Sequence, residues 1–135
     1  MHLVAADARN VIIWSLTPGQ AGDAPEGRQL IAALGPHHGA QVALLMDSAY
    51  EDNATRELAC SLGLHSRWCR PTPGGASPGP TTKPLYRRRN EVERLFRRLK
   101  AWRRVFTRYD KLDAMFAAFI TVAMIAEALR SVNTT

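Results

Sequence analysis

The sequence predicts an α/β domain in which a mixed β-sheet is flanked by helices and followed by a helical C-terminal extension. Three observations support this prediction. Short apolar runs of strand length occupy the N-terminal half, helical patterns alternate with them, and two longer helical patterns end the chain. A hydrophobic content of 46% and a length of 135 residues suit one globular domain, which we expect over residues 1–130.

The N-terminal quarter predicts a hairpin followed by a helix. Residues 2–7 and 11–16 are short apolar runs separated by three residues, which is typical of two strands joined by a turn. A turn at residues 17–19 and a possible short third strand at 20–23 follow. Residues 25–34 have a helical pattern that ends at a Gly-Pro pair.

The middle of the chain predicts two further strands with a helix between them. Residues 41–46 form a continuous apolar run, which favours a strand buried on both faces at the centre of a sheet. A helix is expected over 52–62 and a last short strand over 66–69. Residues 70–85 contain five prolines and three glycines and therefore predict a flexible loop.

Two helices, over about 86–107 and 111–130, complete the predicted order of elements. The first should present an apolar stripe to the core, because the following residues recur at helical spacing: Val92, Leu95, Phe96, Leu99, Trp102 and Phe106. A polar stripe lies beside it, formed by Tyr86, Arg89, Glu93 and Lys100. The ribonuclease H-like fold has this order of elements.

Positive charge is concentrated on the first of these helices. Residues 86–108 carry ten Lys or Arg against Glu91 and Glu93, a net charge of +8 in a chain whose total is +6. Such a patch suits the phosphates of a nucleic acid, although an anionic membrane surface or a plain solvated face remain alternatives. The residues expected to contact DNA irrespective of its sequence are Arg97, Arg98, Arg103 and Arg104.

The longest apolar stretch, residues 114–126, contains no charge but is short for a bilayer span, which needs about 20 residues. We therefore predict a buried C-terminal helix and no membrane partner. Because residues 1–7 lack a basic segment and reach an acid early, no signal peptide is expected.

Three acids are placed where they could converge. Asp7 closes the first predicted strand, Asp47 closes the central one, and Glu93 lies on the basic helix. Functional groups in open sheets gather at strand ends, and three carboxylates suit Mg²⁺ or Mn²⁺. Two such ions could activate a water or a 3′-hydroxyl at a phosphodiester. The alternative for each aspartate is a turn or a helix cap.

The polar stripe also carries a resemblance. Tyr86, Arg89, Glu93 and Lys100 match the pattern Tyr-x2-Arg-x3-Glu-x6-Lys, which is a signature of bacterial insertion-sequence transposases with a DDE catalytic triad. Further segments resemble the same subgroup, at residues 2–9, 16–21, 44–50 and 107–112. Five segments in order, covering nearly the whole chain, make the resemblance specific.

The resemblance implies a function for each of these positions. Asp7, Asp47 and Glu93 would be the catalytic, metal-binding acids, and the cofactor would be Mg²⁺ or Mn²⁺, expected as two ions. Arg89 and Lys100 would hold DNA near the transposon end, and Tyr86 would help to position the strand. The family cuts DNA at terminal inverted repeats and joins the freed 3′-hydroxyl to target DNA in an oligomeric complex.

The predicted protein is therefore the catalytic domain of a DDE transposase that lacks the N-terminal region of its relatives. Its partners would be transposon ends, target DNA, further copies of the chain and the product of an upstream reading frame, in the bacterial cytoplasm at the nucleoid. One alternative is a catalytically inactive remnant that only binds DNA or modulates a full-length enzyme. Another is a basic membrane-associated helical hairpin over 86–130, in which the aspartates are incidental.

Overall fold

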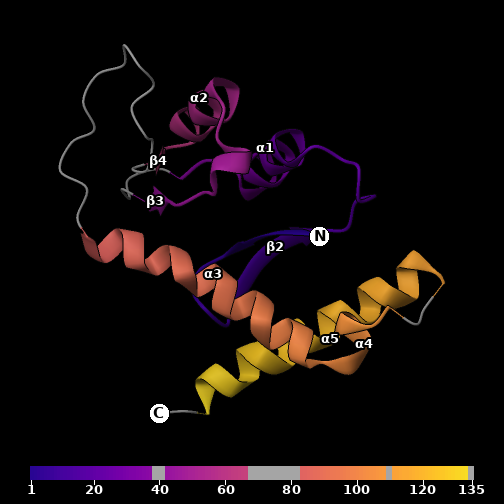
Figure 1. Ribbon diagram of the computed structural model, residues 1–135. Coiled ribbons are helices and arrows are strands. Elements are labelled where there is room, and N and C mark those ends of the chain that lie inside the picture. Colours follow the sequence, from indigo (N-terminus) through magenta and orange to yellow (C-terminus); the bar gives the residue numbers. More distant parts are fainter. Residues whose placement is uncertain (38–41, 67–82, 109–110, 134–135) are drawn as a thin grey trace. The chain divides into compact units, whose positions relative to one another are not determined.

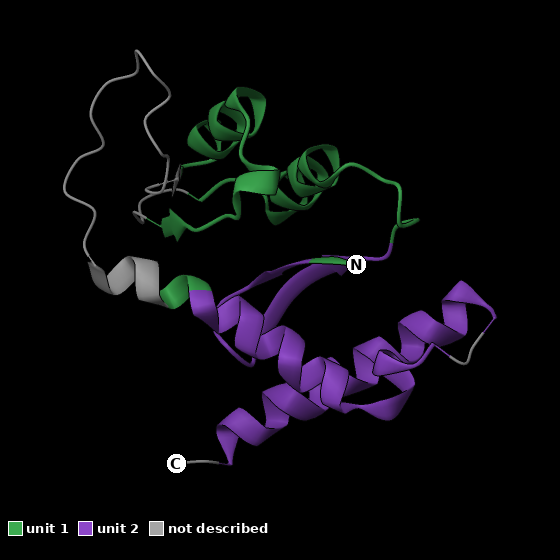
Figure 2. Ribbon diagram, in the orientation of Figure 1, with its two compact units in different colours: residues 1–2, 17–89 green, residues 3–16, 90–135 purple. Residues whose placement is uncertain are grey.

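The computed structural model describes residues 1–37, 42–66, 83–108 and 111–133. It is a mixed α/β structure that is mostly helical, with small strands (Figure 1). It divides into two compact units, which are coloured separately in Figure 2. Unit 1 comprises residues 1–2 and 17–89, and unit 2 comprises residues 3–16 and 90–135.

Unit 1 is built around a parallel pair of strands. Its elements, in chain order, are α1 (Asp23–Leu34), β3 (Val42–Leu44), the 3₁₀ helix η1 (Ser48–Tyr50), α2 (Asn53–Ser61) and β4 (Leu64–Ser66). β3 pairs with β4 so that Val42 faces Leu64, and α2 forms the crossover that a parallel pair requires. Its core contains Ile31, Ala59 and Leu64, which are buried.

Local chemistry sets the bounds of α2. The Asp52 side chain caps the helix by accepting a hydrogen bond from the Thr55 backbone N–H at 2.7 Å. Hydrogen bonds from Thr55, and then from Arg28, lower the pKa of Asp52 to about 2. At the other end, Gly63 has φ 76°, a conformation that favours glycine. The helix predicted over 52–62 is confirmed.

The strands of unit 1 differ from the prediction in three places. No strand forms at residues 20–23, because Pro18–Ala21 is a turn closed by the Ala21 N–H to Pro18 C=O bond of 3.0 Å, and α1 begins at Asp23. β3 is shorter than predicted and exposes Val42 and Ala43, since β4 is its one neighbour among the described strands. β4 begins earlier than expected, at Leu64; residues 67–69 lie outside the described residues.

Unit 2 contains most of the predicted hairpin and the C-terminal helices. β1 (His2–Ala5) pairs with β2 (Val11–Ser15), which confirms the hairpin. α3 (Lys83–Ala101) continues from unit 1 into unit 2, and its first residues lie where a loop was predicted up to residue 85. α4 (Arg103–Phe106) lies against α5 (Asp113–Val132).

The predicted helix over 86–107 is in fact two helices, and the break changes which side chains are buried. Leu95 and Leu99 are fully buried, as their spacing predicted. Trp102, however, has φ −75° and ψ 114°, an extended conformation that ends α3 and starts α4 in a new direction. Phe106 therefore leaves the apolar stripe and is 71% exposed, so its predicted core position is wrong.

α5 is the predicted C-terminal helix, and it is buried along one face. The buried side chains are Ile120, Ala123, Met124 and Glu127, which recur at helical spacing. The opposite face exposes Met115, Val122, Ile125, Leu129 and Val132. The helix has 20 residues and is long and apolar enough to cross a bilayer by length and composition, a test that core helices of soluble proteins also meet.

Candidate functional site

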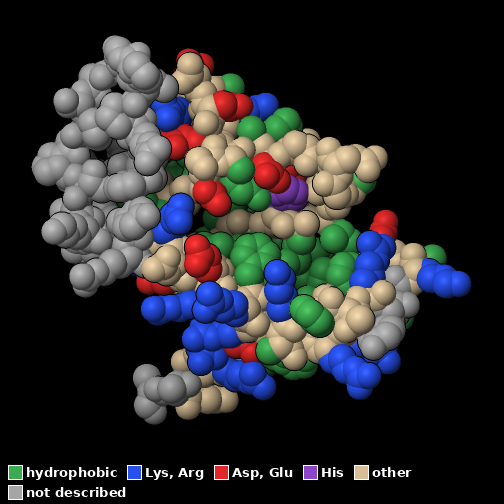
Figure 3. All heavy atoms as spheres, viewed as in Figure 1, with side chains coloured by type: hydrophobic (Ala, Val, Ile, Leu, Met, Phe, Trp, Pro, Cys, Tyr) green, Lys and Arg blue, Asp and Glu red, His purple; other side chains and the backbone are tan. Residues whose placement is uncertain are grey.

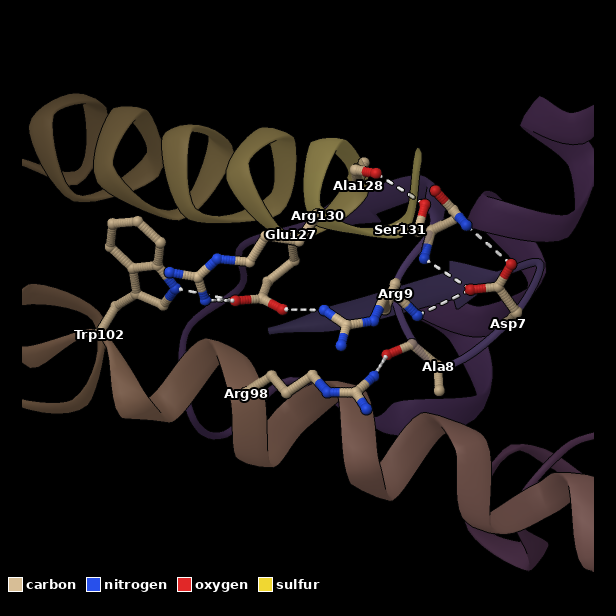
Figure 4. A network of polar contacts seen from close by, with 10 residues as sticks. Asp7, Ala8, Arg9, Arg98, Trp102, Glu127, Ala128, Arg130 and Ser131 are labelled. Atoms are coloured by element: carbon tan, nitrogen blue, oxygen red, sulfur yellow. Dashed lines mark hydrogen bonds and ion pairs between the residues drawn. The ribbon is translucent and has the colours of Figure 1, made fainter. Parts of the chain in front are cut away.

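Asp7 lies in the loop between β1 and β2, and its carboxylate organises that loop. Oδ1 accepts the backbone N–H groups of Arg9 at 2.7 Å and Asn10 at 3.0 Å, and Oδ2 accepts the Asn10 side-chain amide at 2.7 Å (Figure 4). These bonds form an Asx turn. A turn was the alternative to metal binding that the sequence left open for Asp7.

Asp47 follows β3 and caps η1. Its Oδ1 accepts the Ser48 backbone N–H at 2.7 Å, and Arg89 Nη1 of α3 lies 3.7 Å from the same oxygen. Asp47 and Arg89 both belong to unit 1, and the Asp47 side chain is 66% exposed. The structure thus brings together the second predicted acid and the arginine of the signature.

Glu93 is an exposed side chain of α3. It shares unit 2 with Asp7, whereas Asp47 belongs to unit 1. Within the described residues there is no group of three or more His, Cys, Asp or Glu side chains that could hold a metal ion. Convergence of the three acids across the two units therefore stays a prediction.

The basic side chains of α3 and α4 form an exposed surface, and Figure 3 shows Lys and Arg side chains gathered over α3. Arg97, Lys100 and Arg103 are exposed, and the guanidinium of Arg104, also exposed, lies 4.5 Å from the centre of the Phe119 ring. The backbone of Tyr86 lies in α3, but its side chain is outside the described part of the structure. We call the exposed set Arg94, Arg97, Lys100, Arg103 and Arg104 the basic surface.

Arg98 differs from its neighbours on α3. Its guanidinium is half-buried and donates a hydrogen bond of 2.5 Å to the backbone C=O of Ala8 in the Asp7 loop (Figure 4). The sequence placed Arg98 with Arg97 as a DNA contact. In the structure Arg98 instead joins the β1–β2 loop to the helix that carries Glu93.

Sequence reasoning missed one charged residue at the centre of unit 2. Glu127 of α5 has a side chain that is only 3% exposed, and it accepts hydrogen bonds from Arg9 at 3.2 Å and Arg130 at 2.7 Å. Trp102 Nε1 lies 3.5 Å from it. The sequence did contain one indication that Glu127 is buried. Glu127 lies seven residues after Ile120, a helical spacing that places this acid on an otherwise apolar face of the helix.

His2 of β1 has side-chain partners in unit 1. The ring is buried, with Nδ1 2.8 Å from the Tyr50 hydroxyl and Nε2 2.8 Å from the Thr17 hydroxyl. Burial, together with the negative charges of Asp23 and Asp47, raises the pKa of Tyr50. These contacts of unit 1 account for His2 as a structural residue.

Comparisons with known proteins agree with the resemblance carried by the polar stripe. Residues 72–127 match the family described as the transposase DDE domain, a range that contains Glu93 and lies downstream of Asp7 and Asp47. The chain is also 29% identical over 108 residues to a Brucella ovis protein named as a putative transposase for insertion sequence element IS6501, covering 79% of each chain. No solved structure matches.

These matches indicate a class of protein: residues 72–127 of the chain are similar to the transposase DDE domain. More particularly, the chain is similar to a putative insertion-sequence transposase.

Proposed function

We propose that this chain is the catalytic domain of an insertion-sequence transposase, with a ribonuclease H-like arrangement in which Asp7, Asp47 and Glu93 converge. The reaction is cleavage of DNA at transposon ends and transfer of the freed strand to target DNA in the bacterial cytoplasm. The ion pair between Asp47 and Arg89 carries the proposal, because it joins the second acid to the signature helix that bears Glu93.

The donor chemistry of the three acids fits divalent cations. Hard ions such as Mg²⁺ and Mn²⁺ prefer carboxylate oxygens, and each of the three side chains is at least partly accessible to solvent. Bound ions would activate a water or a 3′-hydroxyl and stabilise the leaving oxygen. The residues expected to hold the ions are Asp7, Asp47 and Glu93.

The protein's own groups would orient these acids and the DNA. The Asx turn keeps the Asp7 carboxylate in one orientation through three hydrogen bonds. The basic surface supplies cations for the DNA backbone beside Glu93. In the first step water attacks phosphorus and the 3′ oxygen departs; in the second, that 3′-hydroxyl attacks a target phosphodiester and releases a new 3′-hydroxyl.

An inactive DNA-binding remnant is the second candidate, and one observation favours it. Asp7 and Asp47 both serve as local caps, a role that either aspartate could retain without any metal. The basic surface would then be the one functional feature, acting on DNA or on assemblies of a full-length transposase.

The test compares two glutamates of α3 that differ in position but not in chemistry. Glu93→Gln should abolish Mg²⁺- or Mn²⁺-dependent nicking of repeat-end DNA while DNA affinity is unchanged. Glu91→Gln, on the same helix but off the polar stripe, should leave nicking intact. The assay uses the 135-residue chain with and without the product of an upstream reading frame. Normal nicking by Glu93→Gln would refute the assignment of Glu93 as a catalytic acid. If no sample nicks DNA but every sample still binds it, the result would favour the inactive DNA-binding remnant.

A further inference from the structure

Glu127 is a buried charge that neither the proposed metal site nor the basic surface uses. A carboxylate that is only 3% exposed requires strong partners, because removal of its hydration is unfavourable. The partners are cations and a donor from three different elements: Arg9 from the β1–β2 loop, Trp102 from the α3–α4 junction and Arg130 from α5. Glu127 is therefore the point where these three elements are joined.

One of these partners connects Glu127 directly to Asp7. Arg9 donates its backbone N–H to Asp7 Oδ1 at 2.7 Å and its guanidinium to Glu127 Oε2 at 3.2 Å (Figure 4). Arg98 of α3 makes a second contact with the same loop by donating to the Ala8 carbonyl. The loop is thus attached both to α5 and to α3, the helix that carries Glu93.

We propose that Glu127 is a positioning residue for the metal site: through Arg9 it holds the β1–β2 loop so that the Asp7 carboxylate keeps the orientation needed to bind a divalent ion. The inference rests on the proposed function of Asp7. Residues that orient metal ligands typically change metal affinity or activity by about 10- to 100-fold when replaced. That is the size of effect expected here.

The chain contains a matched control for this role. Arg130 also donates to Glu127, at 2.7 Å, but it lies three residues along the same helix and is 62% exposed. Its guanidinium also lies 5.7 Å from the centre of the Trp102 ring. Arg9→Met and Arg130→Met each remove one cation from Glu127, yet only the first removes the connection between Glu127 and Asp7 through Arg9.

The experiment measures the loop and the metal separately in the 135-residue chain. Amide hydrogen exchange by NMR reports the Arg9 and Asn10 N–H groups that donate to Asp7, and calorimetric titration reports Mn²⁺ affinity. Arg9→Met and Glu127→Gln should speed exchange at both amides and weaken Mn²⁺ binding by about 10- to 100-fold. Arg130→Met should leave both measurements unchanged.

Several results would overturn the inference. The first is an unchanged rate of exchange at the Arg9 and Asn10 amides in Arg9→Met. The second is an equal decrease of Mn²⁺ affinity in Arg9→Met and Arg130→Met, because an equal decrease would indicate general destabilisation. If Glu127→Gln or Arg9→Met fails to fold, Arg9→Lys replaces it. A cation then remains beside the buried acid, while the guanidinium that donates to Glu127 Oε2 is removed. Slower or unchanged exchange in Arg9→Lys would count against the proposal.

Asp7→Asn separates this inference from the proposed function. If Asp7→Asn binds Mn²⁺ as tightly as the unmodified chain, the metal-binding role of Asp7 is wrong, and with it the purpose assigned to Glu127. If Asp7→Asn loses Mn²⁺ affinity while Arg9→Met keeps it, the proposed function stands and only the positioning role fails.

Discussion

Arg89 Nη1 lies 3.7 Å from Asp47 Oδ1, which joins the arginine of the signature on α3 to the acid that follows β3. The Asp47 side chain is 66% exposed and that of Arg89 is 37% exposed. Ion pairs of this kind typically contribute only about 0–1 kcal/mol to stability, so the pair has little value as a structural contact. Its position beside a proposed metal ligand suggests a role in function.

Replacing Arg89 should therefore affect activity much more than stability. Arg89→Gln is expected to change the free energy of unfolding by less than about 1 kcal/mol. Nicking of repeat-end DNA should fall by about 10- to 100-fold, because Asp47 is deprived of a group that orients it. Arg88→Gln, at the exposed neighbouring position, is the control. Urea denaturation and a nicking assay make the comparison, and equal nicking by the two variants would contradict the role of Arg89.

Arg97 and Arg98 are adjacent in sequence but should respond to substitution in different ways. Arg97→Gln together with Arg103→Gln should weaken binding of any DNA sequence and lower the slope of log affinity against log salt by about 0.9 for each phosphate that is no longer neutralised. Stability should be unaffected, because both side chains are exposed. Filter binding at several salt concentrations measures this, and a decrease restricted to one DNA sequence would indicate base recognition instead.

Arg98→Gln should act mainly on stability. It removes the donor to the half-buried Ala8 carbonyl, and an unsatisfied buried acceptor costs about 1–3 kcal/mol. Urea denaturation should show this destabilisation, while the salt slope of DNA binding stays that of the unmodified chain. A variant with unchanged stability and a reduced salt slope would restore Arg98 to the set of residues that bind DNA.

Gly27 in α1 should not tolerate alanine, although alanine is the better helix former by about 1 kcal/mol. A Cβ at this position would lie 2.7 Å from Cδ1 of the Tyr50 ring. Gly27→Ala should therefore lower the free energy of unfolding by about 1–3 kcal/mol through overpacking. Gly19→Ala, where a Cβ meets nothing within 4 Å, is the control in the same denaturation experiment. Stabilisation by Gly27→Ala would show that Tyr50 moves aside easily.

The cap of α2 predicts a specific dependence of stability on pH. The pKa of Asp52 is lowered to about 2 in the folded chain, chiefly by hydrogen bonds from Thr55, against an ordinary value of 3.8. A lowered carboxyl pKa contributes stability above the unfolded value, and this contribution disappears as pH falls from about 4 to about 2. The difference in melting temperature between the unmodified chain and Asp52→Asn should therefore shrink across this window. A constant difference would exclude the linkage.

Interactions between near neighbours in the chain were predictable from sequence. The hairpin and the helix over 52–62 were expected close to their observed bounds, and α3 carries the signature on one helix as predicted. Two errors also have local causes. Residues 20–23 form a turn and helix start instead of a strand, and the extended backbone at Trp102 divides a helix whose apolar spacing continues through it.

The amino-acid sequence alone determined most of the helices, the acids and cations that could act together, and the resemblance to DDE transposases. Helical periodicity, capping and motif spacing depend on residues a few positions apart, which is why these features could be predicted. Only the tertiary structure decided that Arg98 contacts Ala8, that Glu127 is buried against Arg9, and that Arg89 lies beside Asp47. The Arg9–Glu127 contact joins residues 118 positions apart. Such partners are selected by packing of the folded chain, and no local pattern in the sequence encodes them.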